Sequence, residues 1–171
     1  MIYQYIEDHK VTEELDQKLR SLLSASFVNG QDSEVFSRQR FYNEPPQHRY
    51  MIWNEEELVA HVAVHDKQVL INDEAHSICG IAEVCVHSDY RKQGLVKRLL
   101  DNIHQDRTER GDAFSVLFGD VEVYGSSGYE CKSNITVFNP EKEWVAAGKV
   151  MAYALNQSWP EGEVKLIGIP F

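Results

Sequence analysis

The chain has 171 residues, which suits one domain large enough to bury a full core. Its formal net charge of −10 argues against nucleic acid or an anionic membrane as a partner and allows a cationic substrate such as an amine, with solubility as the alternative reason for the charge. No window approaches the ~20 apolar residues of a membrane span, and the first residues, MIYQYIE, have no basic region, so we expect neither a membrane anchor nor a signal peptide. Three cysteines, an odd number, predict no disulfide framework and fit the reducing cytoplasm.

The N-terminal part predicts a strand, two helices and then antiparallel strands. Residues 2–6 alternate as in a strand, and Thr12 is a helix N-cap that precedes carboxylates and leucines at helical spacing. Asn29-Gly30 ends that helix, and a second short helix is expected over residues 32–40. The strands that follow are expected over residues 49–53, 58–65 and 68–71.

The C-terminal part begins with residues 77–87, which predict a strand buried on both faces because they do not alternate cleanly. After a loop, the apolar spacing changes to 3.6 from Gly94, and Gly111 ends this helix. A strand over 113–118, a short helix over 121–127 and strands over 129–137, 149–155 and 163–167 follow. This order predicts an α+β or mixed α/β fold around one sheet, in a single domain over residues 1–171.

The loop before the second long helix is rich in basic residues. Arg91 and Lys92 precede Gly94, and Lys97 and Arg98 follow it. The first turn of a helix has unpaired N–H groups and a partial positive charge, and such an end holds phosphate. A solvated, basic helix start is the alternative interpretation.

Residues 91–96, RKQGLV, resemble the Arg/Gln-x-x-Gly-x-Gly/Ala signature of the GNAT superfamily of acyl-CoA N-acyltransferases, with Val96 in the last small position. Residues 124–130 resemble the later Tyr-x-x-x-Gly-Phe/Tyr block of that family, one strand further on, and the resemblance covers residues 50–140. It implies the GNAT fold, a twisted mixed sheet of about six to seven strands flanked by about four helices. It also implies acetyl-CoA as co-substrate, held by Val84, Cys85, Val86, Arg91, Lys92, Gln93, Gly94, Leu95, Val96 and Lys97.

Further stretches are similar to the aminoglycoside 2'-N-acetyltransferases, namely residues 51–53, 58–64, 79–80 and 159–164. This similarity implies that the acceptor is a primary amine of a small molecule. Where that group has an acidic cluster, this chain has residues 145–150, VAAGKV, which weighs against a polycationic antibiotic as the acceptor.

Glu83 is the candidate base, because desolvation of a carboxylate in an apolar strand raises its pKa toward a useful value. The alternatives are a glutamate that reaches the sheet edge or one that pairs with His or Arg. The resemblance makes Tyr124 the candidate acid, and a phenol with a pKa of ~10 can protonate a departing thiolate. A backbone N–H near residues 84–86 could polarise the thioester carbonyl, and the same strand could pair with the pantetheine amides.

Asp32 and Glu34 lie where GNAT proteins usually place substrate-contacting helices, and together with Phe171 they are the candidates for acceptor binding. A polar helix face is the alternative for the two carboxylates. His61 and His65 share a strand face, yet two-residue spacing is a weak ligand signal, so we expect no metal site.

The leading hypothesis is therefore a cytoplasmic acetyl-CoA-dependent N-acetyltransferase that acts on a small amine. The charge predicts no nucleic-acid or membrane partner, and a homodimer is compatible with the sequence. The alternatives are a non-catalytic GNAT-fold module that binds acyl-CoA or another ligand, and transfer of a longer acyl chain. Nothing marks Cys85 as an activated nucleophile rather than a small buried side chain.

Overall fold

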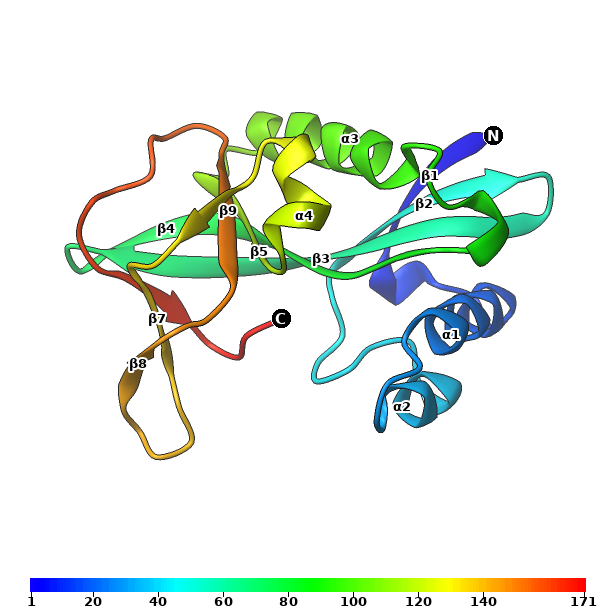
Figure 1. Ribbon diagram of the computed structural model, residues 1–171, viewed down its shortest axis with the longest axis horizontal. Coiled ribbons are helices and arrows are strands. Elements are labelled where there is room, and N and C mark those ends of the chain that lie inside the picture. Colours follow the sequence, from blue (N-terminus) through cyan, green and yellow to red (C-terminus); the bar gives the residue numbers. More distant parts are fainter. The chain divides into compact units, whose positions relative to one another are not determined.

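The computed structural model describes all 171 residues and has a mixed α/β fold (Figure 1). Its helices are α1 (Glu13–Ser26), α2 (Asp32–Arg38), α3 (Leu95–Glu109) and α4 (Val121–Tyr124), with 3-10 turns at Asp8–Lys10, Ser88–Tyr90 and Gly125–Ser127. The strands are β1 (Ile2–Glu7), β2 (His48–Asn54), β3 (Glu57–Ile71), β4 (Glu74–Val86), β5 (Phe114–Phe118), β6 (Glu130–Lys132), β7 (Ile135–Phe138), β8 (Trp144–Ala146), β9 (Val150–Ala154) and β10 (Val164–Ile167).

The strands form one mixed sheet with the hydrogen-bonded order β6-β9-β5-β4-β3-β10-β7-β8, and β2 pairs with both β3 and β1. This arrangement confirms the predicted fold class and the four helices. The sheet has ten strands, however, so the prediction of about six to seven was wrong. None of the helices combines the length and the apolar character needed to cross a bilayer.

Two local features account for two of the additional strands. The predicted strand over residues 129–137 is divided into β6, which pairs with β9, and β7, which pairs with β10 and β8. Asn134 fixes the division, because its side-chain amide donates to the carbonyl oxygens of Pro160 at 2.9 Å and Gly162 at 2.6 Å. The prediction missed β8, which has only three residues and therefore shows no period.

The chain forms two compact units. The first comprises Met1–His65 and Ala82–Leu100, and the second comprises Asp66–Ile81 and Asp101–Phe171. Strands β3 and β4 and helix α3 each contribute residues to both units. The assignment of residues 1–171 to a single domain stays a prediction.

In the first unit, α1 and α2 lie side by side (Figure 1) and cover apolar side chains of the strands. The Thr12 hydroxyl oxygen accepts a hydrogen bond from the Leu15 amide at 3.3 Å, which confirms the predicted N-cap. The helix ends at Ser26, shortly before Asn29-Gly30. The core of this unit contains Leu15, Leu19, Leu22, Leu23, Phe36, Met51, Leu58 and Cys85.

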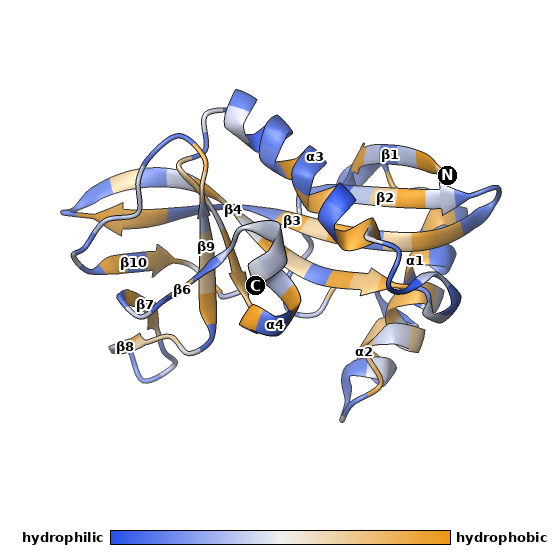
Figure 2. Ribbon diagram, turned by 45° about the horizontal axis from the view of Figure 1, so that its top comes forward, coloured by the Kyte–Doolittle hydropathy of each residue, from blue (hydrophilic) through white to orange (hydrophobic).

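In the second unit, β5 runs parallel to residues 78–81 of β4 and antiparallel to β9, and β10 is antiparallel to the end of β3. Figure 2 shows β10 as mostly hydrophobic, in agreement with the burial of Val164 and Leu166. The Trp159 ring meets the Phe114 ring edge-on, with centroids 4.8 Å apart. These contacts close an apolar core around Val69, Ile78, Phe114, Val116, Ile135 and Val150.

The C-terminal residue packs into this unit through a glycine. A Cβ added at Gly80 of β4 would lie 2.7 Å from the Phe171 ring, and the Phe118 ring meets the same ring edge-on at 5.3 Å. The missing side chain at Gly80 therefore makes the space in which Phe171 sits.

We predict that Gly80→Ala lowers the free energy of unfolding by about 1–3 kcal/mol, because the added methyl group overlaps the Phe171 ring. Urea denaturation measures this change. Gly148→Ala is the control, since an added Cβ there meets nothing within 4 Å. In a Phe171→Ala background the cost of Gly80→Ala should almost disappear, and an unchanged cost there would contradict the packing explanation.

Candidate functional site

Glu83 lies within strand β4, in the first unit, with a backbone conformation that is unusual for a strand. Its φ of +49° lies in the left-handed region, which residues with a side chain seldom adopt. This conformation costs free energy, and other contacts of the fold must compensate that cost. The predicted strand over residues 77–87 therefore contains a local bend at Glu83, within β4.

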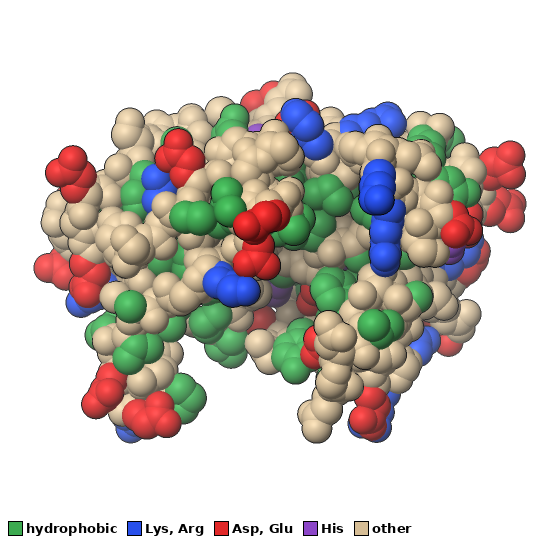
Figure 3. Space-filling model, in the orientation of Figure 1, with side chains coloured by type: hydrophobic (Ala, Val, Ile, Leu, Met, Phe, Trp, Pro, Cys, Tyr) green, Lys and Arg blue, Asp and Glu red, His purple; other side chains and the backbone are tan.

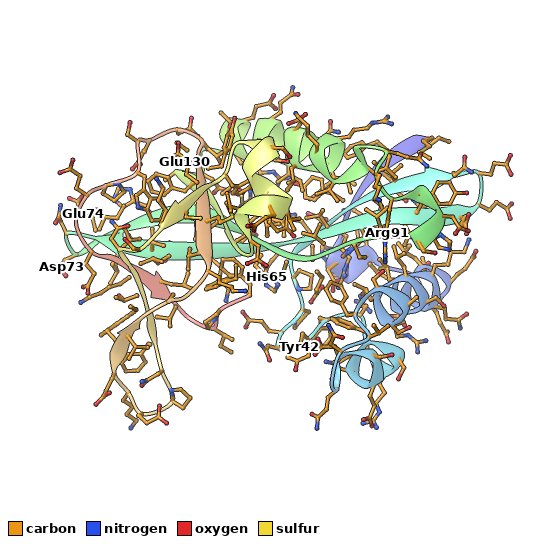
Figure 4. The ribbon with its side chains drawn as sticks, in the orientation of Figure 1. Tyr42, His65, Asp73, Glu74, Arg91 and Glu130 are labelled. Atoms are coloured by element: carbon orange, nitrogen blue, oxygen red, sulfur yellow. The ribbon has the colours of Figure 1, made fainter.

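The Glu83 carboxylate is buried, with a side-chain exposure of 9%. One oxygen, Oε1, accepts a hydrogen bond from the backbone N–H of Tyr42 at 3.2 Å. Tyr42 follows α2, in the loop that leads to β2 (Figure 4). The other oxygen, Oε2, has no hydrogen-bond partner and lies 3.6 Å from Nη1 of Arg49. The side chain thus turns toward Arg49 and the Tyr42 loop, within the same unit.

Burial raises the pKa of Glu83 from its ordinary value of 4.5 to about 7, since removal of water penalises the charged form. The positive charge of Arg49 and the Tyr42 N–H lower the pKa, while the charge of Asp8 raises it further. The carboxyl is consequently about half ionised near neutral pH. A pKa close to the working pH is the property that a general base needs.

Arg49 of β2 lies at the centre of a buried network of hydrogen bonds. Its side chain is fully buried, and its guanidinium donates to Asp8 Oδ1 at 2.7 Å, to His61 Nε2 at 3.2 Å and to the carbonyl oxygen of Arg40 at 2.8 Å. Met51 lies opposite His61 in the β2–β3 register, so Arg49, two residues earlier, is on the same sheet face as His61. The strand register therefore brings the two side chains together.

Asp8 compensates the positive charges of Arg49 and Arg40. Arg40 donates to both of its carboxylate oxygens, each at 2.9 Å. Burial raises the pKa of Asp8, but the hydrogen bond from Arg40 and the charge of Arg49 outweigh this effect and bring the pKa below its ordinary value. Asp8 is therefore ionised at neutral pH and balances part of the buried positive charge.

His61 of β3 is buried and neutral. Burial and the neighbouring Arg49 lower the pKa of its imidazole to about 3. Its Nδ1 lies 3.0 Å from the carbonyl oxygen of Glu83, and its Nε2 faces Arg49. A carbonyl oxygen only accepts and a guanidinium only donates, so Nδ1 must carry the proton and Nε2 must accept.

The loop that joins β4 to α3 has backbone torsions of alternating sign. Lys92 has a φ of +61° and Gly94 a φ of +75°, whereas Gln93 between them has a negative φ. Such alternation turns successive N–H groups to one side, as in anion-binding nests. The first amide of α3 that bonds within the helix is that of Arg98, which donates to Gly94 at 3.0 Å. The preceding amides belong to the first turn of the helix, a position at which N–H groups generally attract phosphate.

Basic side chains surround this loop. Arg91, Lys92, Lys97 and Arg98 are exposed, and Figure 3 shows Lys and Arg side chains gathered where Figure 4 places Arg91. The Arg91 guanidinium donates through Nε to the Val86 carbonyl at 3.2 Å. The basic side chains of this loop thus lie at the surface of the first unit, and their binding of an anion stays a prediction.

Five of the ten predicted cofactor-binding residues are exposed, and the other five are half-buried or buried. Val84, Val86 and Val96 are half-buried, whereas Cys85 and Leu95 are buried and can offer only backbone groups to a ligand. Burial raises the pKa of the Cys85 thiol to about 12, so that the thiolate needed for nucleophilic attack does not form at neutral pH.

Tyr124 lies in the second unit, at the end of α4. A Cβ added at Gly119 would be 2.6 Å from Cε2 of Tyr124, so the ring lies directly over the Gly119 backbone. The buried Tyr129 ring meets it edge-on, with centroids 6.2 Å apart. Tyr129 is itself held by His104 and Ser115 at 2.8 and 2.7 Å.

The predicted acceptor-binding residues have different surroundings. Asp32 begins the seven-residue helix α2 and is half-buried. Glu34 is exposed and forms an ion pair with Arg38 one turn later. Phe171 packs in the second unit over Gly80. No group of three or more His, Cys, Asp or Glu side chains is arranged to hold a metal ion.

Residues 9–131 match the family profile described as the acetyltransferase (GNAT) domain, which is more than half of the chain. The chain belongs to the GNAT acetyltransferase family. Among curated proteins, none matches it by sequence.

Solved structures share the GNAT fold. A GNAT family acetyltransferase from Brucella melitensis, in complex with acetyl-CoA, has 15% identity over 95% of this chain and 94% of its own, with a TM-score of 0.64. A GNAT family N-acetyltransferase from Escherichia coli, in complex with CoA, has 18% identity over 99% of this chain and 94% of its own, with a TM-score of 0.68.

A third structural neighbour, a probable N-acyltransferase, is a larger protein. The conserved protein from Enterococcus faecalis V583 has 20% identity over 76% of this chain, with a TM-score of 0.61, and the chain covers only 32% of that protein's length. At such low identities the likeness concerns the fold. The similarity to the aminoglycoside 2'-N-acetyltransferases stays a prediction.

Four neighbours of Glu83 in this GNAT protein were not predicted from the sequence: Asp8, Arg40, Tyr42 and Arg49. One signal was present: Arg49 is a charged residue directly before the apolar run YMIW. A charged residue at the start of a buried strand requires a partner. The identity of that partner, more than forty positions earlier in the chain at Asp8, is decided by the tertiary structure.

We predict that Glu83→Gln stabilises the protein at pH 8 and has little effect on its stability at pH 5. The folded-state pKa of Glu83, about 7, lies above the ordinary value of 4.5, so the wild type loses stability as pH rises through this interval. The difference in unfolding free energy between Glu83→Gln and wild type should widen by roughly 2–3 kcal/mol from pH 5 to pH 8.

Urea denaturation at the two pH values measures this difference. The control is Glu141→Gln, at an exposed glutamate, for which the difference from wild type should stay constant with pH. A constant difference for Glu83→Gln as well would mean that the carboxyl titrates as an exposed group.

Proposed function

We propose that this GNAT protein transfers an acetyl group from acetyl-CoA to a primary amine of a small molecule, with Glu83 as the general base. The observation that carries the proposal is the buried Glu83 carboxyl with a pKa of about 7 at a left-handed bend within β4, in the same unit as the basic loop from Arg91 to Lys97. Family membership supports the reaction class.

The loop from Arg91 to Val96 would hold the pyrophosphate of acetyl-CoA. Its alternating φ signs and the amides at the start of α3 offer N–H groups to phosphate oxygens, and Arg91, Lys92 and Lys97 add positive charge at the surface. Residues 84–86 would pair through backbone groups with the pantetheine amides. The acetyl-CoA and CoA complexes of the two full-length neighbours support this assignment.

The chemistry is a direct transfer. The neutral amine attacks the thioester carbon, the N–H proton passes to Glu83, the C–S bond breaks, and the departing thiolate takes a proton. A carboxyl that is about half ionised at neutral pH can accept the amine proton and later return it to water. A backbone N–H among residues 84–86 would stabilise the developing negative charge on the carbonyl oxygen.

Tyr124 is the proposed donor of the proton to the thiolate. The support is the match of residues 124–128 to the family's Tyr-x-x-x-Gly block and the packing of the ring over Gly119, which restricts its motion. A neutral phenol can make this donation because its pKa is ~10.

The acceptor is proposed from charge. The net charge of −10 favours a cationic amine, and an aminoglycoside is one candidate of this class. Asp32 and Phe171 are the proposed contacts to the acceptor, and Glu34 is a weaker one because Arg38 already neutralises it. The three free cysteines fit a cytoplasmic location, and a homodimer stays a prediction.

Glu83→Gln should lower kcat by roughly 10²–10⁴-fold, because the proton acceptor is lost, and CoA affinity should be unchanged. Tyr124→Phe should also lower kcat while CoA still binds. The assay screens a panel of amines with acetyl-CoA and reads thiol release, and calorimetry with CoA measures binding. In wild type, kcat/KM should fall below a pH of about 7 with the protonation of Glu83.

The matched control for Glu83→Gln is Glu141→Gln, which should retain full activity. The proposed mechanism would be wrong if Glu83→Gln and Tyr124→Phe both kept the wild-type rate with a confirmed acceptor. If CoA binds but no amine in the panel releases thiol, the alternative of a non-catalytic acyl-CoA-binding module is favoured. Comparison of acetyl-CoA with longer acyl donors tests the chain length.

Gly94→Ala should weaken CoA binding about tenfold. Its φ of +75° is unfavourable for alanine by about 1–2 kcal/mol, so the loop should relax out of the alternating conformation that presents its amides. Space is not the cause, since a Cβ at Gly94 meets nothing within 4 Å. Calorimetry with CoA measures the change, and Gly148→Ala serves as the control. Unchanged affinity for Gly94→Ala would show that the loop does not bind the phosphates.

A further inference from the structure

His61 connects the backbone of Glu83 with the charge beside its carboxylate. Its Nδ1 donates to the Glu83 carbonyl oxygen at 3.0 Å, and its Nε2 accepts from Nη1 of Arg49 at 3.2 Å. That same Nη1 lies 3.6 Å from Oε2 of Glu83. One imidazole thus contacts both the main chain of Glu83 and the cation that faces its side chain.

The carbonyl bond matters because Glu83 has a left-handed backbone. A residue with a side chain adopts a φ of +49° only where its surroundings enforce it. Two hydrogen bonds flank this torsion: the one from His61 to the carbonyl, and the one from the Tyr42 N–H to the carboxylate at 3.2 Å. Without the first bond, the peptide could turn back into the regular strand and carry the side chain to another direction.

We propose that His61 is a positioning residue for the reaction: its neutral imidazole holds the Glu83 carbonyl in the left-handed bend and so keeps the carboxylate in its buried place beside Arg49. This inference rests on the proposed function of Glu83 as the base.

The geometry also requires that His61 stays neutral. A second proton at Nε2 would turn His61 into a cation. Two N–H donors, and two positive charges, would then face each other over the 3.2 Å between Nε2 and Nη1 of Arg49. Burial and Arg49 lower the pKa of His61 to about 3, which agrees with this requirement. His61 is therefore a constant support rather than a pH switch.

Several charged or titratable groups lie around Glu83 and can influence its pKa, and they come from different elements. Arg49 faces it from β2 and Asp8 from the 3-10 turn after β1, while His61 lies on β3 and Cys85 on its own strand. Release of the bend would expose the carboxylate to water or move it toward Arg49. Both changes favour the ionised form, so the Glu83 titration should move down in pH in either case.

The first test uses the wild-type protein. ¹⁵N NMR of histidine-labelled protein reports the tautomer of each imidazole, and the His61 signals are those lost in His61→Asn. We expect His61 to be the neutral Nδ1–H tautomer with no titration between pH 5 and pH 8. A proton on Nε2 alone, or titration near the ordinary pKa of 6.5, would overturn the proposal.

The second test follows the Glu83 carboxyl carbon by ¹³C NMR, with its signal assigned by its loss in Glu83→Gln. His61→Leu removes both hydrogen bonds and should lower the titration midpoint by about one pH unit or more. His61→Asn keeps an amide N–H that can donate to the Glu83 carbonyl, and its midpoint should stay near that of wild type. Equal midpoints in wild type and His61→Leu would contradict the proposal.

Activity measured with acetyl-CoA and the amine panel separates the two hypotheses, namely that Glu83 is the base and that His61 positions it. If Glu83→Gln abolishes the acid limb of kcat/KM and His61→Leu shifts this limb to lower pH with reduced kcat, both are supported. If Glu83→Gln has wild-type activity, the base assignment fails, whatever the NMR shows. If Glu83→Gln is inactive and His61→Leu has a wild-type pH profile, the positioning role alone fails. Should His61→Leu not fold, the tautomer measurement and His61→Asn still decide.

Discussion

The guanidinium of Arg49 carries a full positive charge in a place from which water is excluded, and the removal of such a charge from water costs several kcal/mol unless hydrogen bonds and an opposite charge replace the lost hydration. Asp8, His61 and the carbonyl oxygen of Arg40 supply that replacement, each from a different segment of the first unit. Because these three segments must all meet one side chain, the ion also fixes where they lie. The position of Glu83 beside this cation follows from that arrangement.

Glu83 is held between opposing influences. Its burial favours the neutral acid, and Arg49 with the Tyr42 amide favours the ion, so that its pKa settles near 7 rather than at either extreme. A fully exposed carboxylate would be too weak a base, and a carboxylate in close bidentate contact with Arg49 would hold its charge too firmly. The 3.6 Å separation from Arg49 lies between these cases. The strained backbone and the oxygen without a hydrogen-bond partner are features that stability alone would not favour, and such features cluster at functional sites.

Much of the fold could be predicted because its signals are local. Thr12 caps α1, and the change of apolar period at Gly94 marks the start of α3. The number of strands was underestimated in part because β8 is too short to show a period, and in part because the side-chain amide of Asn134, by bonding to Pro160 and Gly162, divides one predicted strand into two. Those bonds join positions 26 and 28 residues apart, beyond the range of any local pattern.

The sequence by itself determined the family motifs, the basic loop from Arg91 to Lys97, and Glu83 as an unusual carboxylate in an apolar strand. Only the tertiary structure decided which way that carboxylate turns and what surrounds it. The left-handed torsion of Glu83, the tautomer of His61 and the Asp8–Arg49 ion pair all depend on contacts between residues 12 to 41 positions apart. The physical reason is that a pKa and a side-chain direction are set by the groups within a few ångströms in space, whereas a sequence pattern records only neighbours along the chain.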